Sequence, residues 1–248
     1  MSGPIACLDA STAPLRTVPA PGTPAHATLR ALVSSHCFER QAGSVLKLEG
    51  EETRAIYYVL SGWLLASKTM AEGHRQIIDV ILPGGFLEPA SADPDMSALE
   101  IEALTDITMA LIPRHDWRRA CNDHAELADL TYQTVGSVMS RISERMLRLG
   151  KGTAETVIAY ALCELCLRST SRDLVEGAMF HIPMTQAQLG DFCGQSAVHV
   201  CRTLRRFERK GLLDVTDHMD VVILDVDALA RVAEIDLDSL RQEIIPAT

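Results

Sequence analysis

The chain has 248 residues, a formal net charge of −10 and a hydrophobic content of 47%. This composition is typical of a globular protein, and the length suffices for two domains with ordinary cores. The sequence has no apolar run of about 18 residues and no basic N-terminal stretch ahead of an apolar segment, so it predicts neither a membrane span nor a secretory signal. We therefore expect a cytoplasmic protein whose seven cysteines are reduced thiols.

The N-terminal half begins with a segment rich in proline, alanine, threonine and serine, and we expect residues 1–27 to form a tail without a core. Apolar and polar residues then alternate, which is typical of strands, and breaks rich in glycine and acidic residues separate them. The six strand candidates are 43–48, 56–60, 63–67, 76–82, 99–104 and 107–112. Short strands at this spacing predict a small antiparallel barrel or jelly roll over residues 28–122.

The hydrophobic period changes to that of a helix over residues 123–150. Apolar positions there step alternately by four and three, which makes a heptad seam. The seam consists of Ala128, Tyr132, Val135, Met139, Ile142, Met146 and Leu149. A second apolar line of Leu127, Leu130 and Val138 can pack on the chain's own barrel, although the seam itself is the alternative candidate for that packing. We interpret the seam as the dimerisation face of a parallel coiled coil, since twofold dimers are the commonest oligomers.

Residues 184–213 predict two short helices joined by a tight turn, followed by the start of a β-hairpin. Thr185 and Gln188 have the spacing of a capping box at the start of the first helix. Gly194 suits the turn because glycine tolerates positive φ, and Ser196 is a good N-cap for the second helix. This order of elements is typical of a helix-turn-helix.

The second of these helices has one apolar and one basic side. Val200, Leu204 and Phe207 recur at helical spacing and define its buried side. The opposite side carries His199, Arg202, Thr203, Arg206 and Arg209. Five basic residues against two acidic ones give residues 184–211 a net charge of +3 inside an acidic chain, which indicates a localised phosphate-binding surface. A merely solvated helix face is the alternative interpretation, but the charge contrast favours DNA binding.

The C-terminal domain is predicted to cover residues 151–248. Its other elements are a helix at 153–167, wing strands at 214–216 and 221–224 around a turn at 217–220, and a closing helix at 227–234. The last dozen residues show no pattern that predicts an element.

A β-roll, a long dimerising helix and a C-terminal winged helix-turn-helix, in this order, resemble the cyclic-AMP receptor protein / fumarate–nitrate reductase regulator (CRP/FNR) family. The resemblance covers residues 30–234. Its most specific segments are Tyr57–Trp63, Gly73–Asp79 and Leu82–Phe86 in the roll, and Met184-Thr185, Leu189-Gly190, Gly194–Ser196 and His199–Leu204 in the DNA-binding part. It implies an α+β fold with a cyclic-nucleotide-binding-like roll of the cupin type. It also implies a homodimeric bacterial transcription regulator, not an enzyme, whose partners are double-stranded DNA and RNA polymerase and not a membrane.

Two departures from the family bear on the signal. Cyclic-nucleotide binders of the family carry a Gly-Glu cassette and an Arg-Ser pair for the cyclic phosphate, whereas the matching stretches here are Gly85–Glu88 and Met96–Glu102. The segment from Glu88 to Glu102 instead offers carboxylates, which repel a phosphodiester: Glu88, Asp93, Asp95, Glu100 and Glu102. We therefore expect no cyclic AMP in the usual pose and no cofactor, with the effector left open.

The second departure concerns cysteine. The iron–sulfur branch of the family needs three closely spaced N-terminal cysteines, but only Cys7 and Cys37 lie there. Cys163 and Cys166 fall within an apolar helix, where we interpret them as small packing residues. A redox-responsive thiol, for which Cys201 is a candidate, and a haem-responsive sensor remain alternatives.

Two other classes of protein are alternatives to a regulator. One is a cupin-type metal enzyme, which needs histidines that the roll's strands lack, and the other is a scaffold protein.

The resemblance also implies how DNA is contacted. The family places side chains from the start of the recognition helix against base edges, and the matching positions here are Ala197, Val198 and His199, with Arg202 retained. The usual glutamate that accepts a hydrogen bond from cytosine is missing, so the usual half-site is not expected, and Arg202 is the candidate for a bidentate contact with guanine. The other predicted DNA-contacting residues are Thr185, Gln195, Ser196, Thr203, Arg205, Arg206 and Arg209. Twofold symmetry predicts an inverted repeat with half-sites about 34 Å apart.

Overall fold

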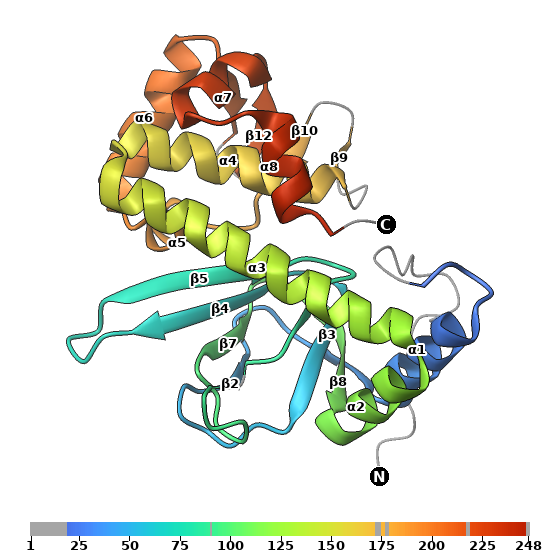
Figure 1. Cartoon of the computed structure of the whole chain (residues 1–248). Helices are drawn as coiled ribbons and strands as arrows, with labels where there is room; N and C mark the ends of the chain where they lie inside the picture. Colours follow the sequence, from blue (N-terminus) through green and yellow to red (C-terminus); the bar gives the residue numbers. More distant parts are fainter. Residues whose placement is uncertain (1–18, 90, 172–174, 177–178, 217–218, 247–248) are drawn as a thin grey trace. The chain divides into compact units, whose positions relative to one another are not determined.

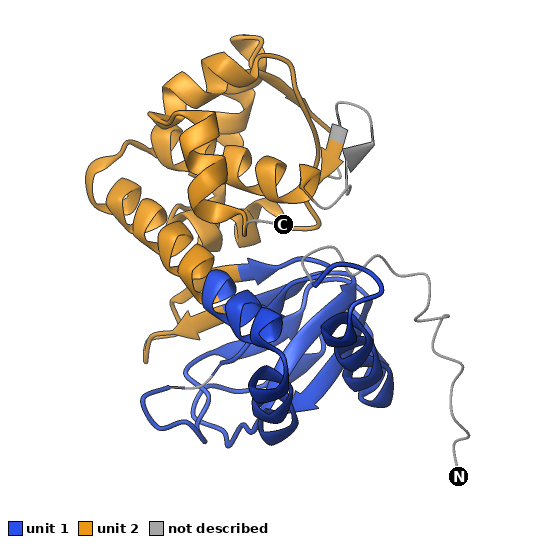
Figure 2. Ribbon diagram, turned by 45° about the vertical axis from the view of Figure 1, so that its right-hand side comes forward, with its two compact units in different colours: residues 1–66, 80–134, 248 blue, residues 67–79, 135–247 orange. Residues whose placement is uncertain are grey.

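The computed structural model groups the chain into two compact units, which are described separately here (Figures 1 and 2). Unit 1 consists of residues up to 66 together with 80–134, and unit 2 consists of 67–79 together with 135–247. The structure describes residues 19–89, 91–171, 175–176, 179–216 and 219–246. In this part of the chain no helix is both long enough and apolar enough to cross a bilayer.

Unit 1 is built around a β-roll. Its strands are β1 (Cys37–Arg40), β2 (Val45–Lys47), β3 (Ala55–Ser61), β4 (Leu64–Thr69), β5 (Arg75–Ile81), β6 (Phe86–Leu87), β7 (Glu100–Ala103) and β8 (Ile107–Pro113). They form two four-stranded sheets with the orders β1-β8-β3-β6 and β2-β7-β4-β5. The six predicted strands are confirmed, while β1 and the two-residue β6 were not predicted, because neither shows a clear alternation. The outer ends of β4 and β5, residues 67–79, belong to unit 2.

The core of unit 1 lies on both sides of β3, because successive side chains of a strand point to opposite faces. Tyr57 and Val59 pack between the two sheets with residues such as Ile101. Ile56 and Tyr58 pack on the outer side against two helices, α1 (Pro24–Ser35) and α2 (Arg114–Asp123).

Helix α1 corrects the predicted tail. Thr23 is its N-cap and accepts a hydrogen bond from the backbone N–H of His26, and Ala25, Leu29 and Val33 are buried against the roll. The tail prediction was therefore wrong for residues 24–27, because composition hid a short apolar line at intervals of four. Residues 19–23 of the predicted tail form no helix or strand, and residues 1–18 lie outside the described residues.

The long helix predicted at 123–150 is confirmed as α3 (Ala125–Lys151). Leu127 and Leu130 are buried in the unit 1 core, as the second apolar line predicted, whereas Val138 is half-buried. The heptad seam is largely exposed in the single chain.

Unit 2 is arranged around α4 (Ala154–Thr170) (Figure 1). This helix is mostly apolar and is buried on nearly all sides, and its buried residues include Glu164 and Arg168. Four helices pack against it: α5 (Gln186–Cys193), α6 (Ala197–Arg209), α7 (Val226–Ala233) and α8 (Leu237–Ile244). The antiparallel sheet has the order β11-β12-β10-β9, with β9 (Val175–Glu176), β10 (Met179–His181), β11 (Leu213–Val215) and β12 (Asp220–Ile223).

The predicted wing and closing helix are confirmed as β11–β12 and α7, although residues 217–218 of the wing's turn lie outside the described residues. Helix α8 was not predicted. Asp236 caps it by accepting a hydrogen bond from the N–H of Ser239, and Leu240 and Ile244 are buried.

Candidate nucleic-acid interface

The turn between α5 and α6 is held by local hydrogen bonds that the sequence predicted. Thr185 Oγ1 accepts from the N–H of Gln188 (3.2 Å), and the N–H of Thr185 donates to Gln188 Oε1 (2.9 Å), which completes the capping box. Gly194 ends α5 at φ +61°, a conformation that disfavours other residues. Gly190 is also sterically required, because a Cβ at this position would lie 2.4 Å from the backbone oxygen of Gln195. The predicted helix-turn-helix is therefore confirmed in its details.

Helix α6 is fixed at its start and along one side. Ser196 accepts a hydrogen bond from the N–H of His199 (3.3 Å), which confirms the predicted N-cap. Val200, Leu204 and Phe207 are buried against neighbouring elements that include α4 and α5, as predicted.

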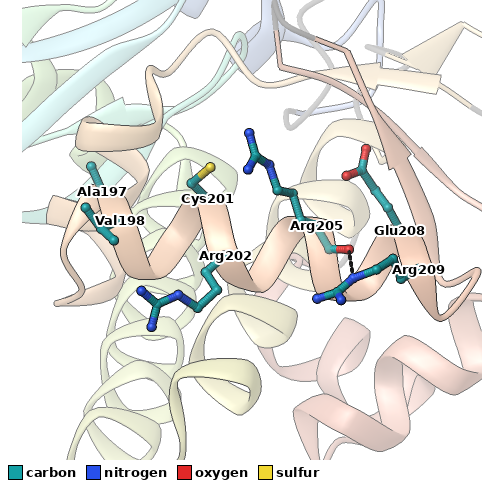
Figure 3. A pocket seen from close by; sticks show the side chains of 7 residues that line it. All are labelled: Ala197, Val198, Cys201, Arg202, Arg205, Glu208 and Arg209. Carbon is teal, nitrogen blue, oxygen red and sulfur yellow. Dashed lines mark hydrogen bonds between the residues drawn. The ribbon is translucent and has the colours of Figure 1, made fainter.

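The outer side of α6 is basic and open. An open hollow of about 850 Å³ runs along it (Figure 3). The hollow is lined by Ala197, Val198, Cys201, Arg202, Arg205, Glu208 and Arg209. Within the described part of the chain, none of the three arginines forms an ion pair; the Nε of Arg209 donates to the backbone oxygen of Arg205 (3.2 Å). Val198 is 64% exposed although it is apolar. These side chains are available to a ligand that is anionic and carries methyl groups.

Two carboxylates near this face have structural partners. Glu208 Oε1 accepts from the N–H of Val215 (3.3 Å), which ties α6 to the first wing strand. Glu155, at the start of α4, pairs with Arg206 and with Lys210 (3.1 Å). These hydrogen bonds lower the pKa of Glu155. Within the described residues, neither carboxylate forms an ion pair with the three arginines of the hollow.

The structure corrects one predicted site residue and qualifies another. Thr203 is only 6% exposed, so the prediction that it lies on the open side of α6 was wrong. Thr203 lies three residues after Val200 and four residues before Phe207, and this helical spacing already places it on the buried side of α6. Arg206 is exposed but paired with Glu155, and its predicted phosphate contact stays a prediction.

The interpretation of most cysteines as packing residues is supported by burial. Cys163 and Cys193 are buried, and burial raises the pKa of each thiol to about 12, which disfavours the reactive thiolate. Cys166 is half-buried, and its pKa is raised by burial as well. Cys121, Cys163, Cys166, Cys193 and Cys201 are free thiols, while Cys7 lies outside the described residues. Cys201 borders the hollow, and a redox role for it stays a prediction.

Sequence reasoning missed a buried ion cluster next to the helix-turn-helix. The carboxylates of Asp79 and Glu164 face three guanidinium groups, from Arg141 and Arg145 on α3 and from Arg168 on α4. All five side chains are less than 10% exposed. The recurrence of arginine on α3 was visible in the sequence, but its acidic partners are distant in the chain, so nothing local indicated burial.

The exposed side of α3 carries the predicted dimerisation seam. Tyr132 is 81% exposed and Met146 is 67% exposed, and Val135 and Met139 are almost as exposed. Leu149 is also exposed, whereas Ile142 is half-buried. Such a continuous apolar stripe on one helix is rare on the surface of a protein that acts alone.

In unit 1, an arginine binds the stretch that corresponds to the family's cyclic-nucleotide cassette. Arg114 is buried; its Nε donates to Glu88 Oε1 (2.5 Å) and its Nη1 to Asp95 Oδ1 (3.2 Å). Its Nη2 donates to the backbone oxygen of Thr53 (3.2 Å). Two of the carboxylates that the sequence analysis singled out therefore have an internal cationic partner.

A capped helix-turn-helix with an exposed row of arginines and an adjacent wing, in a chain that also contains a β-roll, defines a DNA-binding transcription regulator. Comparisons with known families agree: residues 37–124 match the cyclic nucleotide-binding domain, and residues 158–232 match the Crp-like helix-turn-helix domain. The chain belongs to the CRP/FNR family of transcription regulators.

Individual relatives have the same architecture along most of their length. The chain is 28% identical to the nitrogen fixation regulation protein FixK of Bradyrhizobium diazoefficiens, over 76% of this chain and 79% of the relative. It is 25% identical to the transcriptional activator protein FnrL of Cereibacter sphaeroides, over 80% of each chain. The solved structure of FixK2 from Bradyrhizobium japonicum has the same fold, with a TM-score of 0.70 and 23% identity over 79% of this chain and 96% of that one.

Proposed function

We propose that this DNA-binding regulator acts as a homodimer on an inverted-repeat operator, with α6 of each copy in the major groove. The observation that carries the proposal is the combination of an unpaired arginine face on α6 and an exposed apolar seam on α3. Two copies joined along α3 would present two identical recognition helices. Because the dimer has twofold symmetry, its operator is expected to contain two half-sites about one helical turn apart.

The positions on α6 support separate roles in DNA recognition. Among the described residues Arg202 has no carboxylate partner, and it lies in the first half of the helix, so we assign it the bidentate contact with guanine O6 and N7. We assign Val198 to contact with a thymine methyl, and His199 to a hydrogen bond with a purine N7 or a phosphate. Arg205 and Arg209, farther along the helix, are assigned to the phosphate backbone, where they carry no sequence information.

A role as a transcription regulator also bears on the protein's partner, its compartment and its signal. Relatives are described as transcriptional activators, which supports activation through contact with RNA polymerase. Since its ligand is the chromosome, we propose that the protein acts in the bacterial cytoplasm and that it performs no catalysis. We propose that its activity is set by a signal in the roll or by its own expression level.

The contacts of Arg114 support the proposal that cyclic AMP in the usual pose is not that signal. A cyclic phosphate would have to compete with Glu88 and Asp95 for this guanidinium and would lie beside their negative charges. Calorimetric titration with cyclic AMP is expected to give no heat of binding, whereas a saturable heat would contradict this part of the proposal.

A titration of labelled duplex in rising salt tests the main proposal. If phosphate neutralisation by the α6 arginines drives binding, the logarithm of the affinity falls linearly with the logarithm of the salt concentration. Sedimentation of the saturated complex is expected to give two chains per operator. One chain per operator, or an affinity that salt does not change, would contradict the proposal.

A further inference from the structure

The outer end of strand β5 belongs to the DNA-binding unit and not to the roll. Asp79, near the point where the strand passes into unit 1, is buried and bridges two helices of unit 2. Its Oδ2 accepts from Arg141 of α3 (2.6 Å), and its Oδ1 accepts from Arg145 of α3 and Arg168 of α4 (3.2 Å each). One carboxylate therefore fixes α3 and α4 to the same strand.

Three residues earlier, the same strand reaches the helix-turn-helix. Gln76 Nε2 donates to the backbone oxygen of Phe192 (3.2 Å), in the last turn of α5. Gln76 Oε1 also lies close to Gly194, 3.6 Å from where a Cβ would be. Gly194 is followed within two residues by Ser196, the N-cap of α6. The strand thus contacts the turn that sets the direction of the recognition helix.

The charges of the cluster make Asp79 hard to replace. Burial alone would raise the pKa of Asp79, but the nearby charges of Arg141, Arg168 and Arg145 lower it far below its ordinary value, so the carboxylate stays ionised. Asp79 pairs with all three guanidinium groups, so its removal takes a buried negative charge away from each of them. The guanidinium of Arg145 also stacks on the ring of Phe192, 4.6 Å from its centroid, which links the cluster to α5.

We propose that the segment Arg75–Asp79 of β5 positions the recognition helix, with Asp79 anchoring α3 and α4 and Gln76 fixing the end of α5. Asp79 and Gln76 are positioning residues: neither contacts DNA, and both act through the elements that carry α6. Strand β5 continues along the chain into Val80 and Ile81 of the roll. This inference rests on the proposed operator binding.

The experiment compares D79N and Q76A with E72Q, in the full-length protein. Glu72 is an exposed acid in the turn of the same hairpin, so E72Q and D79N remove the same charge from the same segment. Affinities for the selected operator and for a random duplex are measured by fluorescence anisotropy, at a temperature at which circular dichroism shows each variant folded. Misplaced recognition helices lose base contacts but keep phosphate attraction, so the ratio of the two affinities is the informative quantity.

We expect D79N to lower that ratio about tenfold and Q76A about threefold, with E72Q at the wild-type ratio, since a base contact contributes on this scale. Ratios for D79N and Q76A equal to that of E72Q would overturn the inference. If D79N does not fold, Q76A decides alone, because it leaves the buried cluster intact. A wild-type protein that shows no preference for any duplex would overturn the proposed function, and the inference with it.

Discussion

Helix α3 and the face of α6 that lines the hollow each carry three arginines at intervals of three or four residues: Arg141, Arg145 and Arg148 on the first, and Arg202, Arg205 and Arg209 on the second. The fourth arginine of α6, Arg206, pairs with Glu155 and is not one of this row. Those of α3 are buried, and each has an acidic partner in unit 2. Those of α6 are exposed, and none forms an ion pair within the described residues. The same residue at the same spacing therefore holds the fold together in one helix and is available to a phosphate or base in the other. The difference lies in where the chain places its carboxylates.

The largest expected effect concerns the buried ion cluster that contains the arginines of α3. E164Q removes a buried negative charge that faces Arg141, Arg145 and Arg168, and we expect the free energy of unfolding to fall by about 3–5 kcal/mol. Glu155 is the matched control, because it lies on the same helix and also accepts from two basic side chains, but in partly exposed surroundings. We expect E155Q to cost about 0–1 kcal/mol. Urea denaturation followed by far-ultraviolet circular dichroism measures both, and equal losses would show that burial does not distinguish the two acids.

The next effect concerns the exposed seam of α3. Val135→Glu combined with Met139→Glu places charges in the apolar stripe, and we expect monomers that bind the full operator about a hundredfold more weakly, since the two half-sites are no longer linked. V135L/M139L keeps the stripe apolar and is expected to remain dimeric. Light scattering after size exclusion gives the mass, and an unchanged dimer in the double glutamate variant would place the interface elsewhere.

Arginines within the exposed row of α6 are expected to differ from one another. Arg202→Ala should cost about 1–3 kcal/mol on the operator and flatten the preference at one base pair. Arg209→Ala should weaken operator and random duplex alike and reduce the salt slope by about one. Anisotropy titrations on substituted operators separate the two patterns. Equal losses on both duplexes for R202A would show that Arg202 contacts only phosphate.

The smallest expected effect tests the correction at Thr203. Because its side chain is buried, T203V should bind the operator within about twofold of the wild type, in contrast to the base-contacting position at Arg202. The measurement is the same titration, run beside R202A. A tenfold loss with unchanged thermal stability would restore Thr203 to the DNA-contacting face.

Local patterns predicted most of the fold and the recognition helix. The capping box at Thr185, the turn at Gly194 and the buried stripe of α6 are each determined by residues within one or two helical turns, so the sequence contains them in readable form. The strands of the roll were visible for the same reason, through their alternation.

The buried cluster was not predictable in this way. Asp79 and its partner Arg141 are 62 residues apart, and Asp79 alone resembles any polar residue of a half-exposed strand. The three arginines on α3 were compatible with solvent, with DNA or with a buried network, and only long-range pairing decides among these. Helix α1 was missed for a smaller reason, since a proline-rich composition concealed three apolar residues at regular intervals.

The most direct test of the central claim is a selection of binding sites by the purified protein from duplexes with a random central region. We predict enrichment of an inverted repeat whose half-sites are separated by about one helical turn, bound by two chains. Enrichment of a single asymmetric site by a monomer, or no enrichment at all, would contradict the claim that paired α6 helices read the operator.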